Sequence, residues 1–270
     1  MALIALVSAK GAPGVSTAAL VLARTWPRPV VLVEADKAGP SVLPGLLRGT
    51  VAQIGGLVPL AVAAAHNELP DRFWDQTCWL PGGVGGRRGQ EGDSQGRQAF
   101  LLPGLTSPAE APALRNLWGP LASHLASLEA AGCDALVDLG RLGATDDRDA
   151  LVTMADVVAV VTRAWLPDVT AALRLVQARV PAAARTTTSW RTLVVNDGPY
   201  SAAEIAHNAG LSGAGTLAWD PEAARVMSVG APETGKFATS ALMRTARTVA
   251  HDLLNDAQRR RGQLGLQERR

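Results

Sequence analysis

Short apolar runs alternate with segments of helical periodicity along this chain, and this alternation restricts the fold more than any other feature. Residues 2–7 form an uninterrupted apolar run, as expected of a parallel strand that is covered on both faces. Between residues 108 and 131, leucines instead recur every three or four positions, which is helical spacing. The alternation predicts an α/β fold, with a mostly parallel twisted sheet and helices on both faces. The expected strands are residues 2–7, 30–33, 99–102, 135–139, 157–162, 192–196 and 216–219, and the expected helices are residues 17–25, 57–65, 108–131, 168–179, 202–208 and 236–255.

A chain of 270 residues can bury the core of one large domain. With 47% hydrophobic residues and no dominant charge block, it does not have the composition of a disordered protein. We expect a single domain over residues 1–256. Residues 81–98 are rich in Gly, Arg, Gln and Ser and predict a flexible loop, and residues 257–270 predict a basic, disordered tail.

Cysteine usage and hydropathy favour a cytoplasmic protein. Cys78 and Cys133 show no metal-ligand spacing and do not make a disulfide framework, so we expect two free thiols. No apolar run reaches the roughly 18–20 residues that span a bilayer, and the apolar N-terminus lacks the basic residues of a signal sequence. The four histidines are scattered and predict no metal site.

The segment between the first strand and the first helix is the strongest candidate site. Residues 10–17 read Lys-Gly-Ala-Pro-Gly-Val-Ser-Thr, and these small residues let backbone N–H groups approach an anion at a helix N-terminus. Parallel sheets bind ligands beyond the carboxyl ends of their strands, where this loop would lie. The candidate phosphate-binding residues are Lys10, Gly11, Ala12, Pro13, Gly14, Val15, Ser16 and Thr17, with the Ser16 hydroxyl as a ligand for Mg²⁺.

This segment departs from the general phosphate-loop pattern G-x-x-x-x-G-K-[ST] at two positions. When the pattern is aligned on Gly14 and Ser16, the chain has Ala9 in place of the first glycine and Val15 in place of the lysine. The loop alone therefore leaves an alternative open, an ordinary Gly/Pro turn between a strand and a helix.

Two later strands end in carboxylates. Glu34 and Asp36 follow the apolar run at residues 30–33, and Asp138 lies in the run at residues 135–139. P-loop proteins use carboxylates at such positions around Mg²⁺ and the attacking water. The loop and both carboxylates occur in the right order, each at the end of its own strand, which favours a nucleotide site over a simple turn.

On these residues the chain resembles the ParA/MinD family of deviant Walker ATPases, over residues 1–254 with a poor match at residues 40–98. The family's loop reads K-G-G-x-G-K-[ST], and Lys10 matches its signature lysine, which reaches the partner's phosphates in a homodimer. The resemblance implies ATP or ADP and Mg²⁺ as cofactors, with Asp36 orienting water and Asp138 as the Walker B carboxylate. The implied catalytic residues are Lys10, Asp36 and Asp138, and the implied Mg²⁺ ligands, mainly through water, are Ser16, Asp36 and Asp138.

The resemblance extends to the segments that bind the base. Residues 192–196 resemble the family's strand whose terminal asparagine contacts adenine, and residues 217–221 resemble the segment beside the base. At the phosphates, in contrast, Val15 removes the lysine that bridges the β- and γ-phosphates. Loss of one such stabilising donor typically costs about 10²–10³-fold in rate, which predicts weak hydrolysis. The implied base-site residues are Asn196, Trp219, Asp220 and Pro221.

These features give two functional hypotheses. In the first, the chain is a weak ATPase and nucleotide-dependent dimer switch that positions or partitions a cargo, either DNA or a pilus, secretion or conjugation apparatus. Its degenerate loop and its Arg- and Ala-rich composition resemble the TadZ- or CpaE-like members of the family. In the second, the chain is a catalytically inactive scaffold that acts through protein contacts. A metabolic phosphoryl-transfer enzyme is disfavoured because the sequence has no substrate-side acid–base constellation.

Basic residues toward the C-terminus provide a candidate DNA contact, since arginines bind phosphates without sequence specificity. A solvated end without a ligand is the alternative. Leu264 and Leu266 are the only apolar residues beyond the arginines, too few to form the apolar face of a membrane-bound helix. The candidate DNA-contacting residues are Arg244, Arg247, Arg259, Arg260 and Arg261.

Overall fold

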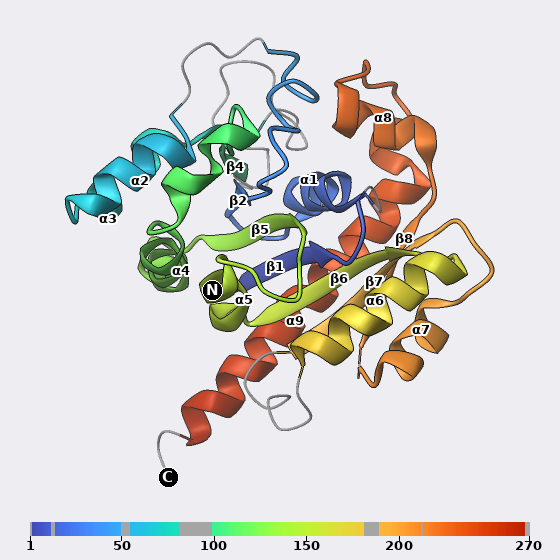
Figure 1. Ribbon diagram of the computed structural model, residues 1–270. Helices are drawn as coiled ribbons and strands as arrows, with labels where there is room; N and C mark the ends of the chain where they lie inside the picture. The colour runs from blue at the N-terminus through green and yellow to red at the C-terminus, as the bar shows by residue number, and fades with distance from the viewer. Residues whose placement is uncertain are drawn as a thin grey trace.

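The computed structural model describes residues 2–11, 14–49, 55–80, 99–180, 189–211 and 213–267, and it contains an eight-stranded sheet (Figure 1). The strand order is β3-β4-β2-β5-β1-β6-β7-β8, and every neighbouring pair is parallel except β3 with β4. The predicted α/β fold is therefore confirmed. The strands are β1 (Leu3–Ser8), β2 (Val30–Glu34), β3 (Cys78–Trp79), β4 (Ala99–Leu102), β5 (Asp134–Arg141), β6 (Val157–Arg163), β7 (Ser189–Asn196) and β8 (Ala214–Ala218).

Helices cover both faces of this sheet (Figure 1). Successive side chains of a strand point to opposite faces, so in β1 Leu3 and Ala5 enter one hydrophobic core while Ile4 and Leu6 enter the other. Helices α1, α8 and α9 pack on the Ile4 side, and α2 to α6 pack on the Leu3 side. The helices are α1 (Val15–Thr25), α2 (Leu57–Ala65), α3 (Leu69–Arg72), α4 (Trp118–Ser127), α5 (Asp149–Met154), α6 (Leu166–Arg179), α7 (Ala202–Ala209), α8 (Pro221–Val229) and α9 (Ala241–Gln267).

The helix expected over residues 108–131 is broken into three pieces. A 3₁₀ segment, Pro108–Leu114, precedes α4, and a second one, Leu128–Ala131, follows it. Proline lacks an N–H group and its ring collides with the preceding turn, and Pro112 lies inside the first segment. The leucine spacing predicted the buried face correctly, but the prolines prevented one continuous helix.

The C-terminal helix extends beyond the predicted domain boundary. Residues 257–267, which we expected to belong to a disordered tail, are the last turns of α9. Ala257 is fully buried, and the Arg261 Nε lies 2.8 and 2.9 Å from the two carboxylate oxygens of Asp156. The sequence indicated only the positive charge of these arginines, whereas the fold provides carboxylates that hold the helix end against the sheet.

Some expectations concern residues outside the described part of the chain. The flexible loop predicted at residues 81–98 lies there, as do Ala12 and Pro13 of the phosphate loop and residues 268–270. Within the described residues, no helix combines the length and the apolar character needed to cross a membrane. The sequence did not predict β3, α5 or α8.

Candidate functional site

The loop between β1 and α1 lies at the carboxyl end of a strand near the middle of the sheet, between β5 and β6. Gly14 precedes α1 with a φ of 92°, a left-handed conformation that glycine adopts without strain. The first turn of α1 carries no acidic residue, so its N–H groups present partial positive charge. The Ser8 hydroxyl donates to the carbonyl oxygens of Lys10 and Gly140, at 2.8 and 3.2 Å, and thereby ties this loop to the end of β5.

Asp138 on β5 is the buried carboxylate of the site. Its side chain accepts hydrogen bonds from the Ser16 hydroxyl and from the Gly140 N–H, the latter at 2.9 Å. Burial raises the pKa of Asp138 to about 7, and the neighbouring Asp36 and Glu34 add to the rise, although the two hydrogen bonds oppose it. A carboxylate in this environment is stabilised by a cation, which is what the predicted Mg²⁺ would supply.

Asp36 lies beside Asp138, at the end of β2. Its Oδ1 accepts a hydrogen bond of 2.9 Å from the Ala38 N–H. Gly140 has a φ of 55°, and a Cβ atom there would collide with the Asp36 carboxylate. Glu34, in contrast, accepts hydrogen bonds from the backbone N–H groups of Ser41 and Val42 at 2.6 and 2.9 Å, so it holds a loop in place.

The donor set fits magnesium only together with a phosphate ligand. Among the described residues, no three His, Cys, Asp or Glu side chains are arranged to hold a metal ion by themselves. Mg²⁺ in nucleotide sites usually keeps several waters and binds one or two carboxylates plus phosphate oxygens. The Ser16 hydroxyl and the Asp138 carboxylate, which contact each other beside Asp36, suit that arrangement.

Lys10 and Val15 determine the positive charge available to phosphates. Lys10 Nζ lies 3.3 Å from Asp168 Oδ1 at the start of α6, and the Lys10 side chain is 47% exposed. Val15 is only 5% exposed and belongs to the core cluster that α1 forms with the sheet. The first turn of α1 therefore provides backbone N–H groups and hydroxyls but no ammonium group.

A pocket of about 130 Å³ lies beside the loop, and its lining includes Gly14, Thr17, Trp219 and Asp220. These four sequence-predicted residues therefore come together. Asn196 does not line this pocket: it is exposed at the end of β7, where it pairs with Ala218 of the pocket wall. Pro221 is the first residue of α8 and lies outside the lining too.

Sequence reasoning missed two residues that shape this pocket. The Arg163 guanidinium lies 5.0 Å from the centre of the Trp219 ring, a cation–π distance. Asp197 accepts hydrogen bonds from Arg163 Nε at 2.5 Å and from Trp165 Nε1 at 3.2 Å. The order Asn-Asp-Gly after β7 contained the signal, but the interpretation used only the asparagine.

A buried arginine joins the end of β5, which carries Asp138, to the residue before Asp36, and nothing in the sequence distinguished it. Arg148 Nη1 donates to the carbonyl oxygens of Ala35 and Leu139 at 2.9 and 2.6 Å. Its Nε and Nη2 contact the Asp146 carboxylate at 2.8 and 2.7 Å, and Nη2 also donates to the Arg141 carbonyl at 2.9 Å. We call Arg148, Asp146 and these three carbonyl groups the Arg148 cluster.

The five arginines predicted to contact DNA have mostly internal partners. Arg244 and Arg247 donate to the carbonyl oxygens of Thr239 and Ala238, at 2.6 and 2.7 Å. Arg259 pairs with Asp256 and Arg261 with Asp156, which partly neutralises the charge at the end of α9. Burial lowers the pKa of Arg260, and the charge of the nearby Asp156 opposes that change.

Comparisons with known proteins identify solved structures that share the fold of this chain. No family model matches the sequence, and no curated protein matches it. The fold is similar to that of the ParA family ATPase from Chlorobium tepidum TLS, with a TM-score of 0.62, 16% identity, and coverage of 92% of this chain and 98% of that chain. It is also similar to the MinD cell division protein of Aquifex aeolicus, with a TM-score of 0.66, 13% identity, and coverage of 94% of this chain and 97% of that chain. A Cyanothece McdA variant in complex with ATP gives a TM-score of 0.61 at 16% identity, with coverage of 94% and 96%.

Proposed function

We propose that this chain binds a magnesium–adenine nucleotide at residues 10–17 and acts as a ParA/MinD-like homodimeric switch with weak ATPase activity. The observation that carries the proposal is the hydrogen bond between Ser16 and the buried Asp138, made where β1 meets α1 in a fold shared with ParA and MinD proteins. The cargo that such a switch would position is DNA or a pilus, secretion or conjugation apparatus.

Each residue of the site has a specific role in this proposal. The N–H groups that open α1 bind the phosphates, and the hydroxyls of Ser16 and Thr17 face the same ligand. Ser16 and Asp138 hold Mg²⁺, which neutralises phosphate charge when bound. Asp36 orients the attacking water, and the pocket lined by Trp219 and Asp220 receives the base.

The surface around the loop supports a dimer through this edge of the sheet. Exposed apolar side chains follow three neighbouring strands: Trp165 and Leu166 after β6, Tyr200 after β7, and Trp219 after β8. Exposed apolar groups that gather on one face mark interaction surfaces. Lys10 lies at the same edge and is exposed, so its ammonium group is free to exchange Asp168 for a partner's phosphates.

Isothermal titration calorimetry tests the nucleotide site. We expect Mg²⁺-dependent binding of ATP and ADP, weakened at least about tenfold by S16A, because a lost metal contact typically costs 10–100-fold in affinity. The matched control is S127A, since the exposed Ser127 hydroxyl donates only to the His124 carbonyl on α4. Absence of heat at millimolar Mg²⁺–ATP, with the protein folded by circular dichroism, would sink the proposal.

Size-exclusion chromatography tests the switch. The dimer should form with ATP and dissociate with ADP, and identical elution in the two nucleotides contradicts gating. Hydrolysis is tested with D36A, which should abolish any phosphate release that the wild-type chain shows. Unchanged hydrolysis removes Asp36 from its role.

A second candidate function is a catalytically inactive scaffold. Val15 favours it, since the position of the missing lysine is filled by a core side chain. The Arg148 cluster favours it too, because it already fixes the loops after β2 and β5 through contacts within the chain. Binding of nucleotide without measurable turnover, and with the same oligomeric state in ATP and ADP, distinguishes this function from the first.

A further inference from the structure

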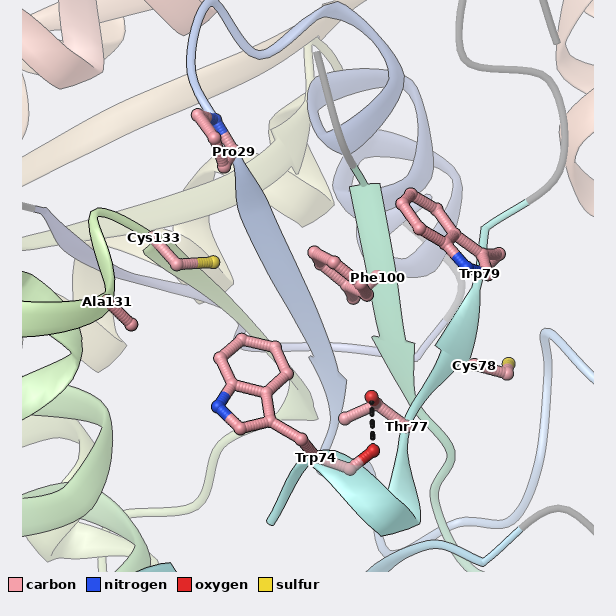
Figure 2. Close-up of a pocket in the computed structure, with 8 residues that line it drawn as sticks. All are labelled: Pro29, Trp74, Thr77, Cys78, Trp79, Phe100, Ala131 and Cys133. Carbon is pink, nitrogen blue, oxygen red and sulfur yellow. Dashed lines mark hydrogen bonds between the residues drawn. The ribbon is translucent and has the colours of Figure 1, made fainter. Parts of the chain in front are cut away.

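A second hollow lies at the opposite edge of the sheet from the phosphate loop. Its lining includes Pro29 and Cys133, which directly precede β2 and β5, so it opens at the amino ends of the strands. Its volume is about 520 Å³, within the usual range of ligand pockets. Figure 2 shows the rings of Trp74, Phe100 and Trp79 around this space, with Cys133 on the opposite side.

The three aromatic rings form a continuous row on the surface. The ring centres of Trp74 and Phe100 are 5.2 Å apart, and those of Phe100 and Trp79 are 4.6 Å apart. Trp74 is 37% exposed and Trp79 is 46% exposed, although large aromatic side chains are usually well buried. The row therefore offers apolar surface that the described part of the chain leaves uncovered.

The described polar side chains of this hollow are uncharged, and two of them are indole N–H donors. Within the described residues, neither the Trp74 nor the Trp79 indole N–H has a hydrogen-bond partner. Among the described residues, no acidic or basic side chain lines the space. Burial raises the pKa of Cys78 to about 11 and that of Cys133 to about 12, so both thiols are neutral at physiological pH. A matching ligand is itself uncharged, with apolar faces and free hydrogen-bond acceptors.

The segment of this chain that adjoins the hollow contains few apolar side chains. Residues 81–98 leave the described structure after Leu80 and rejoin it at Ala99, which are hydrogen-bonded neighbours beside Trp79 and Phe100 at one end of the aromatic row. Their sequence is Pro-Gly-Gly-Val-Gly-Gly-Arg-Arg-Gly-Gln-Glu-Gly-Asp-Ser-Gln-Gly-Arg-Gln, in which Val84 is the single large aliphatic residue and no aromatic residue occurs. This segment therefore supplies few apolar side chains for the three aromatic rings.

We propose that the hollow lined by Trp74, Phe100 and Trp79 binds a proline-rich, extended segment of a partner protein. A polyproline II helix has no internal hydrogen bonds, so its carbonyl groups remain free to accept from indole N–H groups. Its pyrrolidine rings pack on aromatic side chains, and aromatic-lined grooves are the recurrent receptors for such segments. An α-helix satisfies its own carbonyl groups, so it would leave both indole donors unpaired.

The site is independent of nucleotide binding. The aromatic row lies at the amino ends of the strands, whereas the phosphate loop lies beyond their carboxyl ends. A partner bound here leaves the loop and the proposed dimer face accessible. Failure of nucleotide binding would therefore not contradict binding at the aromatic row, and the reverse also holds.

The probe for the test is an uncharged decaproline peptide, titrated into the ¹⁵N-labelled full-length protein. The seven tryptophans give separate indole N–H signals, and we expect saturable shifts at Trp74 and Trp79 but none at Trp165 or Trp219. W74A and W79A should each weaken binding about tenfold, as expected for an aromatic residue at an interface centre. M154A, which removes an exposed apolar side chain on α5, is the matched control and should leave the affinity unchanged.

W74F and W79F guard against misfolding, because they keep a six-membered aromatic ring while removing the N–H donor together with the pyrrole ring. We expect each to weaken binding less than the alanine variant does. A glycine–serine peptide of equal length and an uncharged helical peptide serve as competitors. Tighter binding of the helical peptide, or no saturable shift at Trp74 and Trp79 with decaproline, overturns the proposal.

Discussion

Replacing Arg148 with methionine removes the guanidinium group that joins the loops after β2 and β5. Methionine keeps much of the volume of the side chain and loses every polar contact. The variant leaves the carbonyl groups of Ala35 and Leu139 without their arginine partner, in a part of the protein that water hardly reaches. It also leaves the Asp146 side chain, only 6% exposed, without the guanidinium that neutralises it.

The expected cost of R148M is large. Removing one partner of a buried ion pair costs about 3–5 kcal/mol, because the remaining charge stays desolvated. For a domain of this size the melting temperature should fall by roughly 6–20 °C. R72M is the matched control: Arg72 pairs with Glu68, both side chains are more than half exposed, and such pairs contribute about 0–1 kcal/mol.

Acid denaturation provides a second measurement of the same cluster. Burial opposes ionisation of Asp146, but the hydrogen bonds and charge of Arg148, with help from Lys37, outweigh it and lower the pKa of Asp146 to about 2 from an ordinary 3.8. The resulting stability is fully present above pH 4 and is lost as the pH falls through 2. In R148M this loss between pH 4 and pH 2 should disappear, because the carboxylate no longer has its stabilising partner.

The assay is urea unfolding of wild type, R148M, D146N and the double variant at pH 7 and at lower pH. In the double variant neither charge remains, so its cost should be smaller than the sum of the two single costs. A fall of less than 1 kcal/mol in R148M, equal to that of R72M, would refute the role assigned to the Arg148 cluster. Strict additivity of the two single variants would refute the coupling between Arg148 and Asp146.

Three further predictions concern the phosphate loop. D138N should lose Mg²⁺-dependent nucleotide binding in calorimetry. Its stability at pH 8 should equal or exceed that of wild type, because the amide carries no buried charge. A large loss of stability contradicts this account of the buried charge. V15K should raise nucleotide affinity about tenfold if its ammonium reaches the phosphates, and unchanged affinity in a folded variant indicates that the loop does not cradle them. K10A should abolish ATP-dependent dimerisation in size-exclusion chromatography. It should have little effect on stability, because the contact of Lys10 with Asp168 is exposed. The control K236A, which changes an exposed lysine far from the loop in sequence, should dimerise normally.

The sequence predicted those elements of the fold whose signals lie within a short run of residues. Strands buried on both faces appear as continuous apolar runs, so β1, β2 and β6 could be read directly from residue types. The run at residues 108–131 shows the limit of this approach, since the leucine spacing indicated one helix and the prolines broke it. The two-residue strand β3 depends wholly on its pairing with β4, which no short window of sequence reveals.

The candidate site likewise contains some residues that the sequence revealed and others that it did not. Ser16 and Asp138 were placed by motif, and the structure brings them into contact. Arg148, Arg163 and Asp197 were missed because each acts through residues distant in sequence: Arg148 contacts Ala35, and Asp197 pairs with Arg163. An arginine of this kind is not distinguishable in sequence from the many surface arginines of an Arg-rich chain.

The missing lysine and the Arg148 cluster both reduce the difference that ATP and ADP can make to the proposed switch. A ligand shifts a conformational equilibrium only by the difference in its affinity for the two states. Val15 provides no charge that would distinguish a γ-phosphate, and the Arg148 cluster orders the loops after β2 and β5 without any ligand. We then expect discrimination between ATP and ADP to come largely from Lys10, whose ammonium group pairs with the Asp168 carboxylate. For this reason the dimerisation of K10A in ATP separates a nucleotide-gated protein from a scaffold more sharply than any measurement of turnover.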